Sequence, residues 1–598
     1  MPDHPDPPDH PDHPDHPDHP DDPDHPDDPT QWLARYFQAG QEMMRPSTAD
    51  GAGTPGATPA VDAAGNPYLQ WLAASKGFVE IQQSYLQQMS NLWLGMAAAA
   101  APAAGTAPPD GDKRFAGAAW HSDARFEALT RGYLAYSDLM KSSVEAAPVD
   151  DKTKGQLRFA VRQFVDAMSP ANYLATNPEA MELAIETGGQ SLADGMALLF
   201  KDLAKGRVSM TDEDAFTVGR NIATTEGAVI FENELIEVIQ YAPRTARVHR
   251  RPLVIIPPCI NKYYILDLTP ENSFVRYAVD QGHTVFMLSW RNITVAQGHL
   301  TWDDYLRLGV MRAIDVALDV TGAQDANALG FCVGGTLLAS AMAVMKANAE
   351  AKVASVTLLT TLLDFSDPGE IGVLVTGDSI DAREEKIGKG GVMEGKELAL
   401  TFSSLRANDL IWSYVVSSYL KGKSPPAFDL LYWNADGTNL PGPMFCWYVR
   451  NTYLENNLRV PGKTIQCGVP VDLSGIDVPA FVYASRDDHI VPWRTAYAST
   501  RLLAGDNTFV LGASGHIAGV VNPPSKNKRN YWAGGDAGAD PEQWLATARS
   551  VPGSWWPVYG EWLARQAGDD VAAPAKPGNR TYRRLRPAPG RYVKAKAE

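Results

Sequence analysis

The sequence predicts an α/β fold, in which a mainly parallel sheet with a helical cap insertion follows a helical N-terminal domain. Helix-like periodicity dominates from about residue 31 to about residue 212, and short β-branched runs alternate with helical stretches from about residue 213. Strands that alternate with helices form parallel sheets covered on both faces. The 598 residues, 44% of them hydrophobic, are enough for a large buried core.

Residues 1–30 differ in composition from the rest of the chain. They repeat Pro-Asp-His units with 11 Asp and no Lys or Arg, so most of the formal charge of −17 belongs to them. A tract of Pro and polar residues cannot form a core, and we expect it to be disordered. It holds six of the 12 histidines, but nothing fixes them as ligands, so we expect no metal site. The remaining chain is only mildly acidic, which does not favour a nucleic-acid partner.

Residues 31–212 are expected to form the helical N-terminal domain. Apolar side chains recur at roughly helical spacing between Leu69 and Leu94. This helix either packs on its neighbours or lies on a hydrophobic particle or a partner helix. An Ala/Pro/Gly linker at 96–111 precedes a second helix-like stretch with breaks near residues 169–180. No secretory signal or membrane-spanning segment is visible.

Residues 213–598 are expected to form the sheet domain. The runs that we interpret as buried strands are 252–258, 284–290, 326–331, 353–359, 480–485 and 508–512. About 115 residues, rich in aromatic side chains, separate the fourth run from the fifth. A structureless loop of that length is uncommon in a compact domain, so we expect a helical insertion over about 365–470 that could cap a site. Residues 573–598 form a basic tail.

The segment from Gly330 to Gly334 carries the first chemical signal. It places Cys332 between a predicted strand and a predicted helix, in the GxCxG pattern of a nucleophile elbow. Small residues on both sides permit the strained turn that exposes the nucleophile. The helix N-terminus favours a thiolate and offers the Val333 amide to an oxyanion. The alternative is a buried cysteine packed behind a glycine-rich turn.

Two later loops contain the candidates for a catalytic acid and a catalytic histidine. Asp487, Asp488 and His489 follow the strand at 480–485, and His516 follows the strand at 508–512. Nucleophile, acid and histidine in this order, each past the end of a strand, are typical of α/β-hydrolases. The pattern alone does not choose between the two aspartates. In this fold the loop after the strand at 252–258 supplies the second oxyanion amide, for which Ile260 is the candidate.

Several motifs together resemble the class I poly(3-hydroxyalkanoate) synthases, from about residue 110 to the end. They are GFCVGG, DDHIVPW, GASGHIAGVVNPP, PPCINKYYILDL, LRANDLIW and LLYWNADGTNLPG. The resemblance implies an acyltransferase that polymerises (R)-3-hydroxyacyl-CoA, here 3-hydroxybutyryl-CoA, into polyester with release of CoA. It implies no cofactor or metal beyond the CoA thioester itself.

The resemblance also assigns roles to residues. It implies that Cys332 is the acylated nucleophile, His516 the base and Asp488 the acid, with oxyanion amides from Val333 and Ile260. It implies substrate contacts near Tyr264, Asp267, Arg406 and His489. A homodimer, a cytoplasmic location at polyester granules and granule-associated phasins as partners are implied as well. The absence of CxxC pairs among four cysteines fits a reducing cytoplasm.

A cysteine suits thioester chemistry, because attack by its thiolate exchanges one thioester for another and keeps the acyl group activated. Transfer to a hydroxyl must compete with water, so the site should be dry and lidded. One alternative is a cysteine hydrolase of the same fold, such as a thioesterase or a dienelactone hydrolase-like enzyme. A second is a non-catalytic granule-coating protein. For the basic tail we expect solvation, with contact to CoA phosphates as the alternative.

Overall fold

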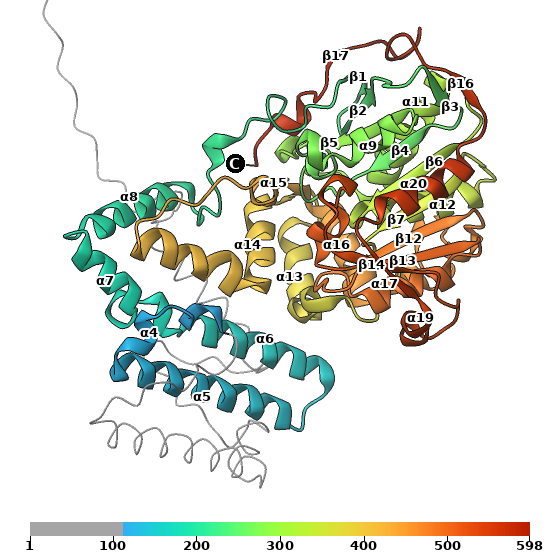
Figure 1. Ribbon diagram of the computed structural model, residues 1–598. Coiled ribbons are helices and arrows are strands. Elements are labelled where there is room, and N and C mark those ends of the chain that lie inside the picture. Colours follow the sequence, from blue (N-terminus) through green and yellow to red (C-terminus); the bar gives the residue numbers. More distant parts are fainter. Residues whose placement is uncertain (1–111, 598) are drawn as a thin grey trace, which may run out of the picture.

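The computed structural model describes residues 112–597. The disordered tract predicted at 1–30 and the helix predicted between Leu69 and Leu94 lie outside the described residues. Figure 1 shows three parts: N-terminal helices, a group of cap helices, and a large twisted sheet flanked by helices. No helix within 112–597 combines the length and apolar character needed to cross a membrane.

The first part of the described chain is helical. Three of its helices begin after a polar residue whose side chain accepts from a free amide: Asp123, Asp150 and Asn177 each cap the helix that follows. Two short turns, η2 (Pro170–Asn172) and η3 (Leu174–Thr176), interrupt the helices where the sequence predicts a break. The helices are α4 (Ala119–Ser122), α5 (Ala124–Ala146), α6 (Asp151–Ala167), α7 (Pro178–Glu186) and α8 (Gln190–Lys205).

The main sheet has eleven strands in the order β15-β14-β13-β12-β7-β6-β4-β5-β2-β1-β17. Its six central strands are parallel, and the strands at both ends are antiparallel. The central strands are β4 (Leu253–Ile256), β5 (Val285–Trp290), β6 (Ala326–Phe331), β7 (Val353–Leu359), β12 (Ala480–Ser485) and β13 (Asn507–Gly512). All six predicted strands are thereby confirmed.

The antiparallel strands were not predicted. They are β1 (Gly227–Glu232), β2 (Ile236–Tyr241), β14 (Asn530–Ala533), β15 (Arg549–Pro552) and β17 (Arg586–Pro587). The edge strand β15 and its neighbour β14 are largely or partly exposed, so they lack the continuous apolar run that marks a parallel strand. Three two-stranded ribbons are formed by β3 (Arg247–His249) with β16 (Asp570–Ala572), β8 (Val392–Met393) with β9 (Leu440–Pro441), and β10 (Ile465–Gln466) with β11 (Val469–Pro470).

Both faces of the sheet are buried under helices. Successive residues of β4 alternate between two hydrophobic clusters: Val254 and Ile256 face one, and Leu253 and Ile255 face the other. The first cluster includes α11 (Arg312–Thr321), α12 (Val333–Ala347) and α17 (Trp493–Leu502), and the second includes α9 (Phe274–Asp280) and α20 (Trp556–Gln566). The smaller helices are α10 (Trp302–Asp304), α18 (His516–Val520) and α19 (Pro541–Thr547).

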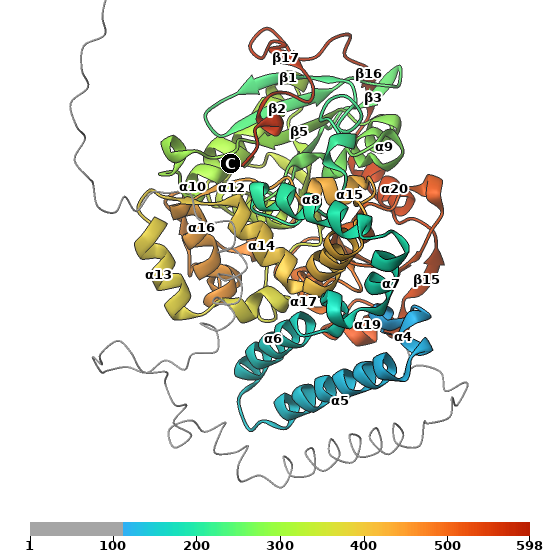
Figure 2. The same cartoon turned by 90° about the vertical axis from the view of Figure 1, so that its left-hand side faces the viewer.

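The interval between β7 and β12 is a helical cap, as the sequence predicts. Its helices are α13 (Gly377–Ile387), α14 (Gly395–Leu405), α15 (Asp429–Asn434) and α16 (Gly442–Val449), with π-helical turns η10 (Asn408–Trp412), η11 (Val415–Leu420) and η12 (Arg450–Leu454). Figure 1 shows α13 and α14 between the N-terminal helices and the sheet, and Figure 2 shows α5 and α6 below the cap. The Tyr419 hydroxyl donates to Asp202 of α8 over 2.7 Å and joins the two parts.

The basic side chains of the tail are mostly exposed, as expected for a solvated tail, but part of the tail backbone and two of its apolar side chains pack against the sheet. Strand β17 pairs with β1, and Arg586 forms an ion pair with the buried Glu237 of β2. Tyr592 and Val593 are buried, and the backbone amides of Arg591 and Tyr592 donate to the same Glu237 carboxylate. A buried carboxylate requires such partners, so the tail completes the core of this sheet edge.

Candidate active site

Cys332 lies on a strained turn between β6 and α12. Its backbone has φ 55° and ψ −129°, in the left-handed half of conformational space that residues other than glycine avoid. A Cβ atom at Gly330 would overlap the backbone of Gly335, and one at Gly334 would overlap the carbonyl groups of Ile256 and Pro257. The glycines are therefore required for the elbow, which leaves the thiol partly exposed at the C-terminal edge of the sheet.

His516 and Asp488 form the second part of the site. Asp488 follows β12 and His516 follows β13, so both reach the sheet edge at which β6 ends. His516 Nδ1 lies 2.6 Å from Asp488 Oδ2. Burial acts to lower the pKa of His516, but the Asp488 carboxylate and a hydrogen bond with Cys332 overcome it and raise that pKa well above 6.5. The His516 ring also stacks on Phe331, with 5.7 Å between ring centroids.

The choice between the two aspartates depends on how the loop after β12 folds. The Asp488 side chain is 0% exposed, whereas Asp487 is exposed to solvent. Asp488 Oδ1 accepts from the amides of Ile490 and Val491, each over 2.9 Å. Both oxygens of Asp488 therefore have partners, and the carboxylate is held in one orientation toward His516.

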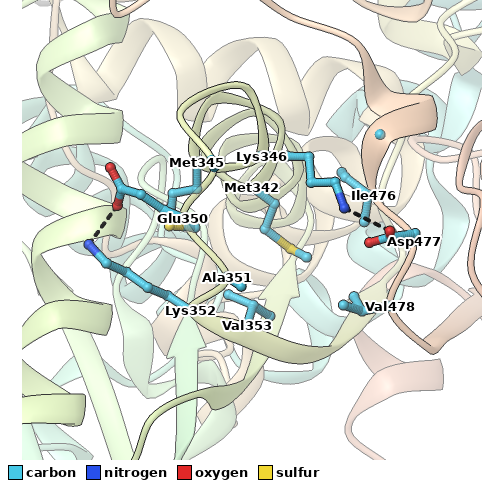
Figure 3. A pocket seen from close by; sticks show the side chains of 12 residues that line it. Met342, Met345, Lys346, Glu350, Ala351, Lys352, Val353, Ile476, Asp477 and Val478 are labelled. Carbon is cyan, nitrogen blue, oxygen red and sulfur yellow. Dashed lines mark hydrogen bonds and ion pairs between the residues drawn. The ribbon is translucent and has the colours of Figure 1, made fainter.

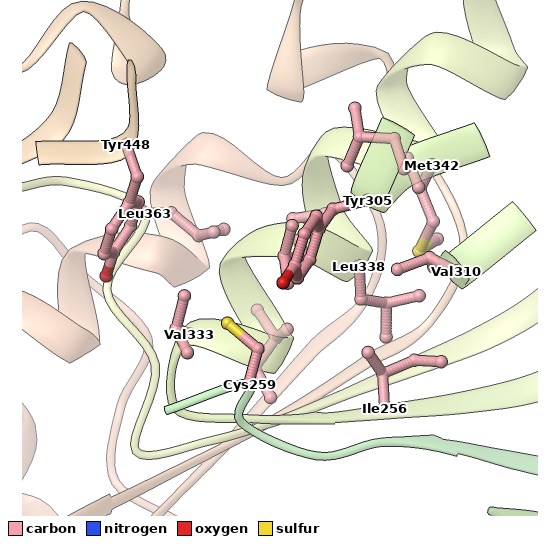
Figure 4. Close-up of a cluster of buried hydrophobic side chains, with 14 of the residues drawn as sticks. Ile256, Cys259, Tyr305, Val310, Val333, Leu338, Met342, Leu363 and Tyr448 are labelled. Carbon is pink, nitrogen blue, oxygen red and sulfur yellow. The ribbon is translucent and has the colours of Figure 1, made fainter. Parts of the chain in front are cut away.

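The loop after β4 lies beside the elbow. Cys259 is buried next to Val333 at the start of α12, as Figure 4 shows. Burial is the main cause of the raised pKa of the Cys259 thiol, and the neighbouring Cys332 raises it further. Cys259 is therefore a packed thiol. The carbonyl of Ile260 accepts from the Thr438 amide over 2.8 Å, which fixes the peptide that follows Ile260. The two backbone positions considered for an oxyanion, Val333 and Ile260, thus belong to segments that meet near Cys332.

Two of the residues expected to contact substrate point into the protein interior. The Tyr264 hydroxyl donates to Asp436 Oδ2 over 2.8 Å, and both residues are buried. Asp267 Oδ1 accepts from Ser273 over 2.6 Å and from Thr225 over 2.5 Å. Burial raises the pKa of Asp267 to about 6, against the hydrogen bonds that lower it. A role of either residue in substrate contact stays a prediction.

Asp267→Asn should stabilise the protein at alkaline pH. Because the folded pKa lies above the value of 3.8 for an exposed carboxyl, the charged form is disfavoured in the fold, and stability is lost as pH rises through about 6. Asparagine keeps an oxygen acceptor without the charge, so the free energy of unfolding at pH 8 should rise by about 1–3 kcal/mol. Urea titrations at pH 8 and pH 4 measure the free energy of unfolding, and the stabilisation should vanish at pH 4. A higher KM with unchanged stability would instead indicate substrate contact.

The other two expected contacts, Arg406 and His489, line one pocket of about 480 Å³. Arg162 of α6 pairs with Glu370 in the same pocket, with nitrogen–oxygen distances of 2.8 and 3.0 Å. The Glu370 amide donates to the carbonyl of His489 over 3.0 Å. His489 directly follows Asp488, so this pocket joins the N-terminal helices, the cap and the loop of the acid.

A second pocket, of about 320 Å³, lies at the far end of α12. Met342, Met345 and Lys346 contribute to it, and Lys346 pairs with Asp477 over 2.7 Å (Figure 3). Because α12 rises by about 1.5 Å per residue, this pocket is about 20 Å from the elbow at the other end of the helix. It is separate from the site at Cys332.

Sequence reasoning missed the aromatic side chains that the cap brings over the elbow. The pKa of Tyr448 on α16 and of Tyr453 on η12 is raised by burial, and Cys332 contributes in both cases, which places both phenols near the thiol. Phe365 packs edge-on against Tyr453, with 5.0 Å between ring centroids. The aromatic richness of the insertion was the available signal, but it could not indicate which rings face Cys332. Within residues 112–597, no group of three or more His, Cys, Asp or Glu is arranged to hold a metal ion.

Comparison with known proteins gives matches along most of the chain. Residues 111–278 match the family model described as the N-terminus of poly-beta-hydroxybutyrate polymerase (PhaC), and residues 252–523 match the alpha/beta hydrolase fold. The chain is 55% identical over 544 residues to the poly(3-hydroxyalkanoate) polymerase subunit PhaC of Cupriavidus necator, covering 90% of this chain and 92% of that protein. It is 42% identical to the poly(3-hydroxyalkanoate) polymerase of Methylorubrum extorquens, covering 88% of each chain.

Proposed function

The chain belongs to the poly(3-hydroxyalkanoate) polymerases, acyltransferases with the α/β-hydrolase fold, and on that premise we propose that it polymerises (R)-3-hydroxyacyl-CoA through a thioester on Cys332. The observation that carries the proposal is the arrangement at the sheet edge. Asp488 lies 2.6 Å from Nδ1 of His516, and both Asp488 and the thiol on the elbow interact with this histidine and raise its pKa. This is the arrangement of an activated nucleophile with an oriented base.

In the acylation step the Cys332 thiolate attacks the carbonyl carbon of the donor thioester. The resulting oxyanion would be stabilised by the amides of Val333 and Ile260. Collapse of this intermediate breaks the bond to CoA sulfur, and the imidazolium of His516 supplies the proton for the leaving thiol. The raised pKa of His516 supports this role, because the ring stays protonated at neutral pH.

In the transfer step the 3-hydroxyl of another monomer or of the growing chain attacks the acyl thioester. The new ester bond forms, the bond to Cys332 sulfur breaks, and the hydroxyl proton must pass to a base. Both Asp488 oxygens already accept hydrogen bonds or face His516, so His516 is the direct proton acceptor that we propose. The packed rings of Tyr448 and Tyr453 support a dry site in which a hydroxyl can compete with water.

The product distribution tests this function. Purified protein supplied with (R)-3-hydroxybutyryl-CoA should release CoA and accumulate polyester of matching acyl content. CoA release with free 3-hydroxybutyrate as the product would indicate a cysteine hydrolase instead. The same assay over 3-hydroxyacyl-CoAs of increasing length would measure the monomer preference, for which we propose the C4 substrate.

The remaining properties concern assembly and location. We propose a homodimer in the cytoplasm, bound to the polyester granule and to phasins, with no cofactor besides the CoA thioester. Exposed apolar side chains on α7 and α8 support contact with an apolar surface: Ile185 is 78% exposed, Phe200 63% and Met196 50%. Failure of the purified protein to sediment with polyester granules would contradict the granule contact.

A further inference from the structure

The end of the basic tail contacts the loop that carries Ile260. The buried Lys262 donates from Nζ to the carbonyl of Ala595 over 2.8 Å. The next carbonyl, that of Lys596, accepts from Asn292 Nδ2 over 2.8 Å. Figure 1 shows the C-terminus beside α15 of the cap and β5 of the sheet. The last described residues of the chain thus lie between the sheet and the cap, on the side where the loop after β4 emerges.

The cap holds the same loop from another direction. The Thr438 amide donates to the carbonyl of Ile260 over 2.8 Å, and Asn261 forms an isolated bridge with Gly437. Trp433 Nε1 donates to the carbonyl of Lys262 over 2.6 Å. The loop from Ile260 to Lys262 is therefore fixed by cap residues on its backbone and by the tail on its one charged side chain.

Lys262 is a charged residue in a buried position. It is 3% exposed, and burial lowers its pKa to about 8, against the attraction of Asp436. A buried ammonium group is unfavourable unless its protons are accepted. The Ala595 carbonyl is such an acceptor, and the Lys596 ammonium pairs with the neighbouring Asp436 over 3.2 Å. Removal of the tail would leave Lys262 without this acceptor, two residues from the amide of Ile260.

The tail is itself anchored before it reaches Lys262. The Tyr592 hydroxyl donates to the carbonyl of Asn233 over 2.6 Å, and its amide donates to Glu237. These contacts lie on the β1–β2 edge of the sheet and set the position of the residues that follow. The contact between Lys262 and Ala595 therefore joins the loop to a fixed point of the fold.

We propose that Lys262 and the C-terminal residues Ala595 and Lys596 are positioning residues for the Ile260 amide. By holding the loop after β4, they keep this amide in the direction of the oxyanion that forms on attack by Cys332. The inference rests on the proposed function, in which Ile260 is one of two oxyanion donors. Oxyanion donors act only in the correct geometry, so a small displacement of the loop lowers the rate of acylation.

Two variants test the proposal independently. Lys262→Met removes the donor with little change in side-chain length, and deletion of residues 595–598 removes the acceptor while leaving Tyr592 in place. Lys594→Met is the matched control, since it neutralises an exposed lysine of the same tail. Each protein is compared in its rate of CoA release from (R)-3-hydroxybutyryl-CoA and in its rate of alkylation by iodoacetamide at Cys332. Alkylation requires the thiolate but forms no oxyanion.

We expect kcat for CoA release to fall about 10-fold to 100-fold in both variants, with KM and the alkylation rate within about two-fold of wild type. Lys594→Met should match wild type. Unchanged CoA release in either folded variant would overturn the proposal, and so would an equal loss of CoA release and alkylation, which indicates a general disturbance. If Lys262→Met does not fold, the deletion decides alone. A failure of the proposed function gives a different result. In that case, wild-type protein that has been alkylated at Cys332 would still release CoA.

Discussion

Cys332→Ala is expected to abolish polymer formation and to lower CoA release by at least about 10³-fold. The variant removes the atom that accepts the acyl group, and no second thiol is available to replace it. Cys259 is buried beside it and its pKa is raised, so it stays a neutral thiol at the pH of the assay. Release of CoA from (R)-3-hydroxybutyryl-CoA and mass spectrometry of the acylated protein measure the effect.

Cys467→Ala is the control for this substitution. Cys467 is partly exposed but lies with its Sγ near the carbonyl of Asp303, on the β10–β11 ribbon and away from the elbow. Its loss should leave CoA release within about two-fold of wild type. Substantial CoA release by Cys332→Ala, or an acyl group found on another residue, would contradict the assignment of the nucleophile.

Asp488→Asn should lower kcat by about 10³-fold to 10⁴-fold, the size of effect known when such an acid loses its charge. The carboxylate raises the pKa of His516, so the imidazolium persists above the usual value of 6.5. Without that charge, burial lowers the pKa, and the ring loses its proton at a lower pH. Alkylation of Cys332 near pH 7 should therefore slow, because the imidazolium that stabilises the thiolate is depleted. The effect should be smaller at pH 9.

Asp488 and His516 also contribute to stability, and the direction in which this contribution changes with pH can be measured. A histidine whose folded pKa is raised contributes stability that is fully present below about pH 6.5 and is lost as pH rises through the raised value. The deficit of Asp488→Asn in unfolding free energy should therefore be larger at pH 6 than at pH 9. Asp487→Asn is the matched control, because this neighbour is exposed and should show neither effect. Equal losses in the two variants would contradict the assignment of Asp488.

The parallel part of the sheet was predictable because its strands are buried on both faces. Strands such as β4 and β12 appear in the sequence as continuous apolar runs bounded by turn residues. Strand β2 is equally buried but contains Glu237, which a sequence pattern assigns to the surface. Its partner, Arg586, is more than 300 residues away, and no local signal connects the two.

The elbow was predictable for a related reason. A strained turn between strand and helix demands small residues at fixed offsets, so Gly330 and Gly334 mark the position of Cys332 in the sequence. The convergence of Cys332, the aspartates and His516 follows from the parallel sheet, in which the loops after all these strands open on one edge. These features depend on residues close in sequence and on the direction of the strands.

Other features were decided only by tertiary structure. Which aspartate faces His516 depends on the fold of the loop after β12, where Asp488 is enclosed by the amides of Ile490 and Val491. The basic side chains of the tail stay mostly exposed, as predicted, but the packing of Tyr592 and Val593 on the sheet edge and the contact of the tail end with Lys262 were not predictable. The physical reason is the same in both cases. Local patterns report backbone geometry and periodic burial, whereas the partner of a buried charge is chosen by contacts between distant segments of the chain.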